Sequence, residues 1–205
     1  MSTAPTAAQP AATKRDARRR ELADSALRTL GELGYAKASL REIANNSEFS
    51  HGVVHYYFDD KLDLIVSCVQ QYKATCVHRY DGVIAAASSP HELVELFADK
   101  LVETIVDEAP MHRLWYDLRS QSMFEEDLRD AVLAIDATLE DMIWRVVSTY
   151  AELAGREPAM SSDVTYGLLD GLFQQALLGH LSGRPIALET LRRQVCGLMP
   201  VLLSV

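Results

Sequence analysis

Residues 39–65, SLREIANNSEFSHGVVHYYFDDKLDLI, decide the fold of this chain. Ser39 predicts the start of a helix because its hydroxyl can accept a backbone N–H of the first turn, and Glu42 completes a capping box. Ser50 stands in the same place before a second short helix, which residues 58–60 end. Two short helices joined by a tight turn and followed by a longer helix are typical of a helix-turn-helix unit.

The two faces of this unit differ in chemistry. We expect the following side chains to face inward: Ile43, Ala44, Phe49, Val54 and Tyr57. The outward positions of the second helix carry no acidic side chain: Ser50, His51, Gly52, Val53, His55 and Tyr56. Such a face can donate hydrogen bonds to phosphates and base edges, and a short helix fits the major groove of duplex DNA.

The segment before this unit is predicted to form one long helix. Apolar side chains recur there at three- and four-residue spacing, as one buried stripe: Leu22, Ala26, Leu30 and Leu33. Gly34 is expected to close this helix. Residues 1–13 are rich in Ala, Pro and Thr without apolar periodicity, so we expect a disordered tail there and assign residues 14–60 to the DNA-binding domain.

The remainder, residues 61–205, is predicted to be helical as well. Segments containing Pro, Gly or acidic pairs separate the apolar patterns, and no period-2 strand bounded by turn signals occurs. The expected helices run from 61 into the 80s and over 90–108, 111–121, 126–154, 162–182 and 187–203. The sequence therefore predicts an all-α fold of about nine helices.

Composition and charge restrict the classes of function. The 205 residues carry a net charge of −9, but residues 1–61 hold nine basic and eight acidic side chains, whereas residues 62–205 hold eleven and twenty-one. An acidic body repels nucleic acid, so any DNA contact must come from the N-terminal piece. No apolar stretch is long enough for a membrane span and the N-terminus lacks a secretory signal pattern. Three widely spaced cysteines argue against a disulfide framework, so we expect a cytoplasmic protein.

Residues 15–66 resemble the DNA-binding domain of TetR-family transcriptional repressors. The resemblance rests on the long first helix, the Ser39 cap, the Ile43–Ala44 pair, Ser50 followed by Gly52, and the aromatic cluster ending in Phe58. It implies a homodimer on a palindromic double-stranded operator. Carried over position by position, it implies these DNA contacts: Arg41, Ser50, His51, Gly52, Val53, His55, Tyr56, Tyr57 and Lys61.

Two positions depart from the family pattern. Glu48 stands where the family usually has a glycine in the turn, so either Glu48 adopts a left-handed conformation at about 1–2 kcal/mol or the turn differs in detail. His55 replaces a usual tyrosine, and protonation of its ring would raise DNA affinity at acidic pH.

Residues 168–186, LLDGLFQQALLGHLSGRPI, more loosely resemble the final helices of the betaine-regulator-like branch of that family. There the last two long helices pair with those of a second subunit. The resemblance implies that residues 61–205 bind an effector and form the dimer, with Gly167, Gly171 and Gly179 allowing close helix approach. The alternative is that these glycines are merely tolerated in a buried helix.

The effector is expected in a cavity between the helices of the second domain. Large and polar side chains gather in residues 112–124 and in the later helices, and we take these as candidates: His112, Trp115, Tyr116, Arg119, Met123, Trp144, Tyr166 and Phe173. Ordinary core aromatics at helical spacing would explain them equally well. If the betaine-like resemblance extended to the ligand, an aromatic cage for a quaternary amine would be expected.

Other readings of the same residues are weaker. Asp59, Asp60 and Asp63 have the spacing that holds magnesium diphosphate in prenyl-transfer enzymes, but a second acidic motif is missing. His51 and His55 have the spacing of a zinc pair without a further ligand at the right distance. With no nucleophile elbow or phosphate loop, the sequence predicts no enzyme, cofactor or resident metal.

The sequence thus favours a dimeric repressor that a small molecule of unknown identity releases from DNA by shifting the fourth helix. A ligand-independent DNA-binding regulator or activator is the alternative, and a magnesium-dependent prenyl-transfer enzyme is a remote one.

Overall fold

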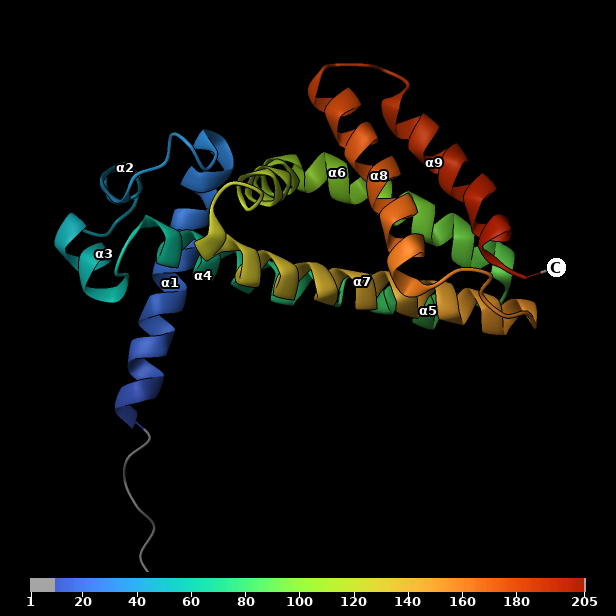
Figure 1. Ribbon diagram of the computed structural model, residues 1–205, viewed down its shortest axis with the longest axis horizontal. Coiled ribbons are helices and arrows are strands. Elements are labelled where there is room, and N and C mark those ends of the chain that lie inside the picture. The colour runs from blue at the N-terminus through green and yellow to red at the C-terminus, as the bar shows by residue number, and fades with distance from the viewer. Residues whose placement is uncertain (1–9, 205) are drawn as a thin grey trace, which may run out of the picture. The chain divides into compact units, whose positions relative to one another are not determined.

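The computed structural model describes residues 10–204, with side chains described from residue 14 onward. Within these residues the chain forms nine α-helices and one short 3-10 helix. The described part contains no β-strand, and Pro158 and Leu203 form an isolated β-bridge. The helices are α1 (Pro10–Leu33), α2 (Leu40–Asn45), α3 (His51–Tyr57), α4 (Lys61–Cys76), α5 (Asp81–Ala86), α6 (Pro90–Gln121), α7 (Glu126–Ala154), α8 (Ser162–Leu181), α9 (Ala187–Leu198) and η1 (Met199–Leu202), as Figure 1 shows. The predicted all-α class is confirmed.

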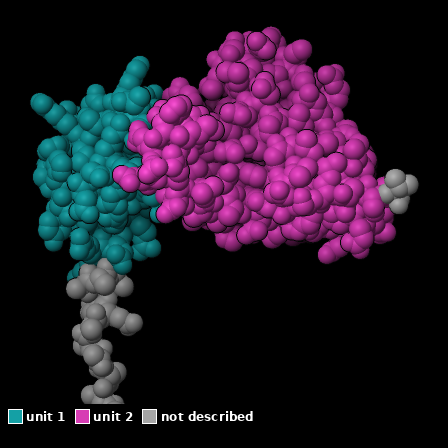
Figure 2. Space-filling model, viewed as in Figure 1, with its two compact units in different colours: residues 1–71 teal, residues 72–205 magenta. Residues whose placement is uncertain are grey.

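The chain divides into two compact units, Met1–Gln71 and Tyr72–Val205, which Figure 2 colours separately. The division falls inside α4, whereas the sequence placed it before Lys61. The first part of α4 belongs to unit 1 because it is tied to α1: Arg19 pairs with Asp63, and the Cys68 thiol donates to the Ala23 carbonyl at 3.2 Å.

In unit 1, local sequence signals set the helix ends. The Ser39 and Ser50 hydroxyls accept the backbone N–H groups of Glu42 and Val53 at the starts of α2 and α3. Gly34 ends α1 with φ +75°, a conformation that favours glycine. Most predicted inward residues form the core of the unit: Leu22, Ala26, Leu30, Ile43, Ala44, Phe49 and Val54. Leu33 and Tyr57, also expected to face inward, are only half-buried.

The turn between α2 and α3 differs in detail from a glycine turn. Among the described residues no side-chain-bearing residue has a positive φ, so Glu48 carries no left-handed strain. Ser47 closes the turn instead, because its hydroxyl donates to the Ala44 carbonyl and accepts the Phe49 N–H, both at 3.2 Å.

In unit 2, α6 packs against α7, α8 and α9. The helix α6 is kinked where the sequence predicted a break: Glu108 has non-helical backbone angles, two residues before Pro110, which lacks the N–H that a helix interior needs. Helices α8 and α9 form an antiparallel hairpin (Figure 1) around Gly183, whose φ is +69°.

Three predicted segments differ from the structure. The tail expected over residues 1–13 lies outside the described residues as far as residue 9, and residues 10–13 already belong to α1. The helix expected from 61 into the 80s is two, because a turn at residues 77–80 separates α4 from α5. The last helix ends at Leu198, and η1 follows.

Candidate DNA-binding and effector sites

The outward face of α3 is open to solvent. Ser50, His51, Gly52, His55 and Tyr56 are exposed, and Val53 is half-buried. Tyr56 reaches furthest, with 70% of its surface exposed, and its ring meets that of Tyr57 edge to face at 5.0 Å between centroids. Arg41 is exposed on α2, and Lys61 is half-buried at the start of α4. The candidates of α3 therefore share one helix, whereas Arg41 and Lys61 lie in the first turns of α2 and α4.

Basic side chains of α1 hold this unit together. The Arg19 guanidinium lies 4.4 Å from the centre of the Phe58 ring and donates to the Tyr57 carbonyl at 2.5 Å, and Arg18 lies 4.5 Å from the Phe49 ring. Two basic side chains of the N-terminal piece are therefore used in packing within the unit. The Lys61 ammonium lies 4.2 Å from the Tyr35 ring, at the exposed edge of the unit.

The acidic and histidine pairs do not assemble a metal site. Asp60 accepts the backbone N–H of Asp63 at 2.8 Å, and Asp63 pairs with Arg19, so these acids stabilise the start of α4. His51 and His55 place their Nε2 atoms 3.2 Å apart on the exposed face of α3. Over the described part of the chain, no group of three or more His, Cys, Asp or Glu side chains could hold a metal ion.

Unit 2 contains a cavity with an empty volume of about 550 Å³, part of it open to solvent. Helices α4, α6, α7 and α8 and the turn after α4 supply its walls. Its apolar lining is Leu101, Leu139, Met142, Ile143, Leu169 and Phe173, and its aromatic lining is Tyr80, Trp115, Tyr116 and Tyr166. The polar lining is Lys73, Cys76, Arg79, Thr104, His112 and Asp170. The cavity is thus mainly apolar with a few convergent polar groups, as small-molecule sites are.

Lys73 and His112 are buried titratable groups of this lining. Burial lowers the pKa of Lys73 to about 8, with the positive charge of Arg79 acting in the same direction. Burial, together with the charges of Lys73 and Arg79, lowers the pKa of His112 to about 3, so its ring is neutral at physiological pH. Lys73 is only 4% exposed, and its ammonium lies 5.0 Å from the Trp115 ring.

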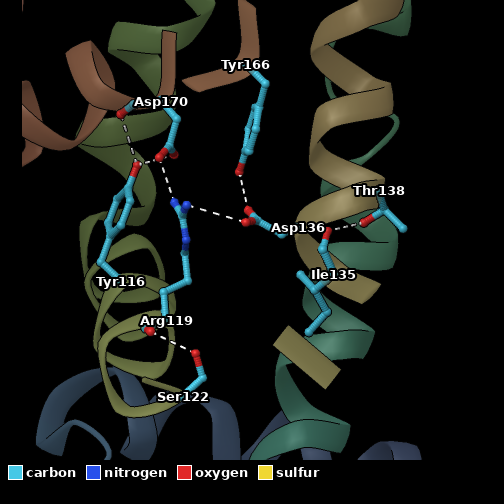
Figure 3. A network of polar contacts seen from close by, with 8 residues as sticks. All are labelled: Tyr116, Arg119, Ser122, Ile135, Asp136, Thr138, Tyr166 and Asp170. Carbon is cyan, nitrogen blue, oxygen red and sulfur yellow. Dashed lines mark hydrogen bonds and ion pairs between the residues drawn. The ribbon is translucent and has the colours of Figure 1, made fainter. Parts of the chain in front are cut away.

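A polar network fixes the wall formed by α6, α7 and α8 (Figure 3). Arg119 of α6 donates to Asp170 of α8 at 2.6 Å and pairs with Asp136 of α7 at 3.4 Å. The hydroxyls of Tyr116 and Tyr166 donate to Asp170 and Asp136 at 2.8 and 2.6 Å. Although burial acts to lower it, the two carboxylates raise the pKa of Arg119, so its charge is retained. The network therefore connects three helices through one guanidinium.

We expect Asp170→Ala to lower the free energy of unfolding by about 2 kcal/mol, because Arg119 loses its shorter ion pair and the Tyr116 hydroxyl loses its acceptor. Urea denaturation of the purified chain measures this. The control Asp141→Ala removes an exposed carboxylate of α7 and should have an effect close to zero. Equal effects of the two changes would show that the network adds nothing to stability.

A second polar cluster lies at the kink of α6. The Glu108 carboxylate accepts from both Arg79 and the Tyr72 hydroxyl. Glu108 is the residue whose backbone leaves helical geometry, so the kink at Pro110 directs this carboxylate toward Arg79. Arg79 of the lining is thereby neutralised within the chain.

The effector candidates from the sequence divide into three groups. His112, Trp115, Tyr116, Tyr166 and Phe173 line the cavity. Arg119 is not a lining residue but holds Asp170, which is one. Met123 and Trp144 lie elsewhere: Met123 is 74% exposed in the turn after α6, and Trp144 lines a shallow groove with Arg145 and Glu152.

The cavity residues of α4 and of the turn after it were not predicted from the sequence. Lys73, Cys76, Arg79 and Tyr80 precede the other lining residues by a long stretch of chain. One signal could have found Lys73: it occupies an apolar stripe at helical spacing with Val69 and Cys76, where a solvated lysine would not be expected.

The glycines assigned to the dimer interface do not share one environment. A Cβ added at Gly167 or Gly171 would meet nothing within 4 Å, whereas one at Gly179 would lie 2.8 Å from the Cβ of Ala187 in the same chain. Gly179 therefore serves the approach of α9 to α8, and the intersubunit role expected from the sequence has no support in its position. The face of α8 around Gly167 and Gly171 carries exposed apolar side chains: Val164, Leu168 and Leu178.

The chain is similar in sequence to a known family of proteins. The family described as "Bacterial regulatory proteins, tetR family" matches residues 22–68, which span the second half of α1, the helices α2 and α3, and the first half of α4. The HTH-type transcriptional regulator BetI of Cronobacter sakazakii is 28% identical over 199 residues, covering 89% of this chain and 93% of the relative. The chain belongs to the tetR family of transcriptional regulators.

Other relatives and solved structures agree with a tetR-family regulator. The BetI protein of Burkholderia thailandensis is 30% identical over 120 residues, 56% of this chain and 60% of that protein. A regulator from Saccharomonospora viridis in complex with choline superposes with a TM-score of 0.74 at 16% identity, covering 92% of this chain and 98% of the other. FadR from Bacillus subtilis in complex with stearoyl-CoA gives 0.69 at 17% identity, with 88% and 96% covered. The two structures share the fold of this tetR-family regulator while holding chemically different ligands.

The family assignment also resolves the remaining alternatives for the class of protein. This tetR-family chain is a transcriptional regulator and not an enzyme, so the prenyl-transfer interpretation of the acids near Asp60 is dropped. None of the described helices is both long and apolar enough to cross a membrane.

Proposed function

We propose that this tetR-family regulator is a repressor that a small molecule releases from its operator. The observation that carries the proposal is the largely apolar cavity of unit 2, in a chain whose α2 and α3 form a helix-turn-helix. The helix α4 contributes Lys61 to the candidate DNA face and Lys73 to the cavity lining. A ligand acts on DNA binding only if it prefers the conformation that does not fit DNA, and α4 is the element through which that preference would act.

The operating form would be a homodimer on a palindromic operator, in the cytoplasm. One α3 can read only a few base pairs, so two copies related by a twofold axis are needed for a specific site. The exposed apolar face of α8 supports pairing there, because Val164, Leu168 and Leu178 are 48%, 41% and 61% exposed. Gly167 and Gly171 leave room on that face for a facing helix.

Two steps test the proposal. DNA bound by the purified chain is first selected from a random double-stranded pool, and the recovered site is then challenged with a library of metabolites. We expect a palindromic site and at least one metabolite that weakens binding to it. A site whose affinity no ligand changes would instead favour the ligand-independent regulator.

The contact face of α3 can be tested separately. We expect Tyr56→Ala and Lys61→Ala each to weaken operator binding by about tenfold, and Lys61→Ala also to lower the slope of log affinity against log salt by about one. Fluorescence anisotropy at several salt concentrations measures both, with helicity and dimerisation as checks of folding. The control Lys100→Ala changes an exposed pair with Glu103 in unit 2 and should leave DNA binding unchanged. Unaltered binding by both α3-face variants would overturn the assignment of this face.

A further inference from the structure

We infer that the cavity of unit 2 binds an organic anion, a carboxylate carried on an apolar body, with the Lys73 ammonium as its charged partner. The inference rests on the proposed function, since it names the chemical class of the effector. It starts from the charges that line the cavity, which are Lys73, Arg79 and Asp170.

Two of these three charged side chains already have an ion-pair partner within the chain. Arg79 pairs with Glu108, and Asp170 accepts from Arg119 at 2.6 Å and from Tyr116 at 2.8 Å. Lys73 is different: within the described residues no ion pair or hydrogen bond reaches its ammonium, which contacts the rings of Tyr72 and Trp115 at 5.5 and 5.0 Å from their centres. Lys73 is therefore the one charged side chain of the described lining without an ion pair or hydrogen bond, and the carboxylates of Asp170 and Glu108 act on it only from a distance.

Unused hydrogen-bonding groups lie on the same lining. The Nε1 atom of Trp115 and the Nε2 atom of His112 are fully buried without a partner, in residues that are 2% and 5% exposed. A buried polar atom without a partner is costly, so each is expected to find one in the ligand or in water. The indole N–H donates, which suits a carboxylate oxygen. The neutral His112 ring already bonds to the Thr104 backbone, so its Nε2 is left as an acceptor, which suits a hydroxyl or a water molecule.

The same inventory argues against a cationic ligand. A quaternary amine would need the aromatic rings free of other cations or a free carboxylate. Here the Lys73 ammonium already lies over Trp115, and the Asp170 carboxylate is already held by Arg119. The aromatic cage for a quaternary amine suggested by the looser sequence resemblance is therefore disfavoured. The rest of the lining, including Leu139, Met142 and Phe173, suits an apolar body.

The test compares three probe series of matched chain length on the full protein: linear carboxylates from butanoate to decanoate, the corresponding alcohols, and the corresponding alkyltrimethylammonium ions. Binding is measured by calorimetry and by the shift in melting temperature, without DNA. We expect at least one carboxylate to bind about tenfold or more tightly than its alcohol, and the ammonium ions to bind more weakly still.

Three variants identify the charged partner. Lys73→Met should remove the preference for carboxylate over alcohol, Lys73→Arg should keep it, and the matched control Lys100→Met should leave it unchanged. Carboxylate preference that survives Lys73→Met, ammonium ions that bind best, or no carboxylate that binds more tightly than its alcohol would each overturn the inference.

The pH dependence gives a second readout. The Lys73 ammonium has neighbours on several elements. They are Cys76 from α4, Arg79 from the turn after it, Glu108, His112 and Trp115 from α6, and Asp170 from α8. Since burial leaves the pKa of Lys73 at about 8, carboxylate affinity should fall as the pH rises above 8, and Lys73→Arg should remove that fall. A wild-type affinity that is constant through this range would contradict the role of Lys73.

The outcome for DNA is separate. A carboxylate that binds as expected but leaves operator affinity unchanged supports the anion site and contradicts the repressor proposal. A metabolite of another class that releases DNA, with no carboxylate binding, supports the repressor proposal and overturns the anion site.

Discussion

Replacing both Leu168 and Leu178 with glutamate is expected to convert the regulator to a monomer and to weaken operator binding by about a hundredfold or more. Both side chains lie on the exposed face of α8, at 41% and 61% exposure, beside the open positions Gly167 and Gly171. In a twofold interface both subunits use the same face of α8, so the glutamates of the two copies face one another while apolar contact is lost. Each α3 would then bind its half-site without the effective concentration that pairing supplies.

Analytical ultracentrifugation measures the oligomeric state, and anisotropy with the selected operator measures binding. The control is Leu133→Glu, which introduces one glutamate at a leucine of α7 that is 64% exposed. That control should remain dimeric and bind DNA normally. If the double variant stays dimeric while the control dissociates, the interface lies on α7 and the assignment of the α8 face is wrong.

Replacing Lys73 with methionine is expected to raise the free energy of unfolding by about 3 kcal/mol near pH 7. The reason is the burial of an ammonium without an ion-pair partner, which lowers its pKa from 10.5 in the unfolded chain to about 8 in the folded one. Methionine has a similar length and no charge to desolvate, so it removes this cost without opening a large cavity. A residue that lowers stability at no gain within the chain is typical of a site kept for a ligand.

The pH dependence of this effect has a definite sign. Below pH 8 the lysine is protonated in both states, so the whole cost of burial is present. Between pH 8 and 10.5 the unfolded chain keeps the proton that the folded chain releases, so the wild type gains stability as the pH rises. The advantage of Lys73→Met should therefore shrink across this range, whereas Lys100→Met should differ from wild type by a constant small amount. Denaturation at several pH values measures it, and a destabilised Lys73→Met would mean that the ammonium has a partner within the protein.

Much of unit 1 could be predicted from the sequence. The Ser39 and Ser50 caps, the glycine at position 34 and the break around residues 58–60 are where the structure has them. In unit 2 the same holds for the kink before Pro110. Each of these signals acts over about four residues, within one turn of helix. The exposed face of α3 follows from the same local pattern, because the side chains that fill the core leave the opposite face outward.

The cavity was predictable only in part. His112, Trp115 and Tyr116 could be proposed because they lie within one turn of each other on one helix. Trp144 was proposed on the same grounds of size and polarity, but its position on α7 turns it to a separate shallow groove. Aromatic composition alone does not tell which side of a helix faces a cavity when several helices surround it.

The all-α class, the Ser39 and Ser50 caps and the acid-free face of α3 follow from the local sequence, because they depend on contacts between residues a few positions apart. Three contacts follow from the packing of the helices alone: Lys73 meets Trp115 in one cavity, Arg119 pairs with both Asp136 and Asp170, and Gly179 packs against Ala187. These contacts join different helices or opposite sides of a turn, so they depend on how helices pack and not on the propensity of any one of them. The ammonium of Lys73, buried without an ion pair, is a property of that packing.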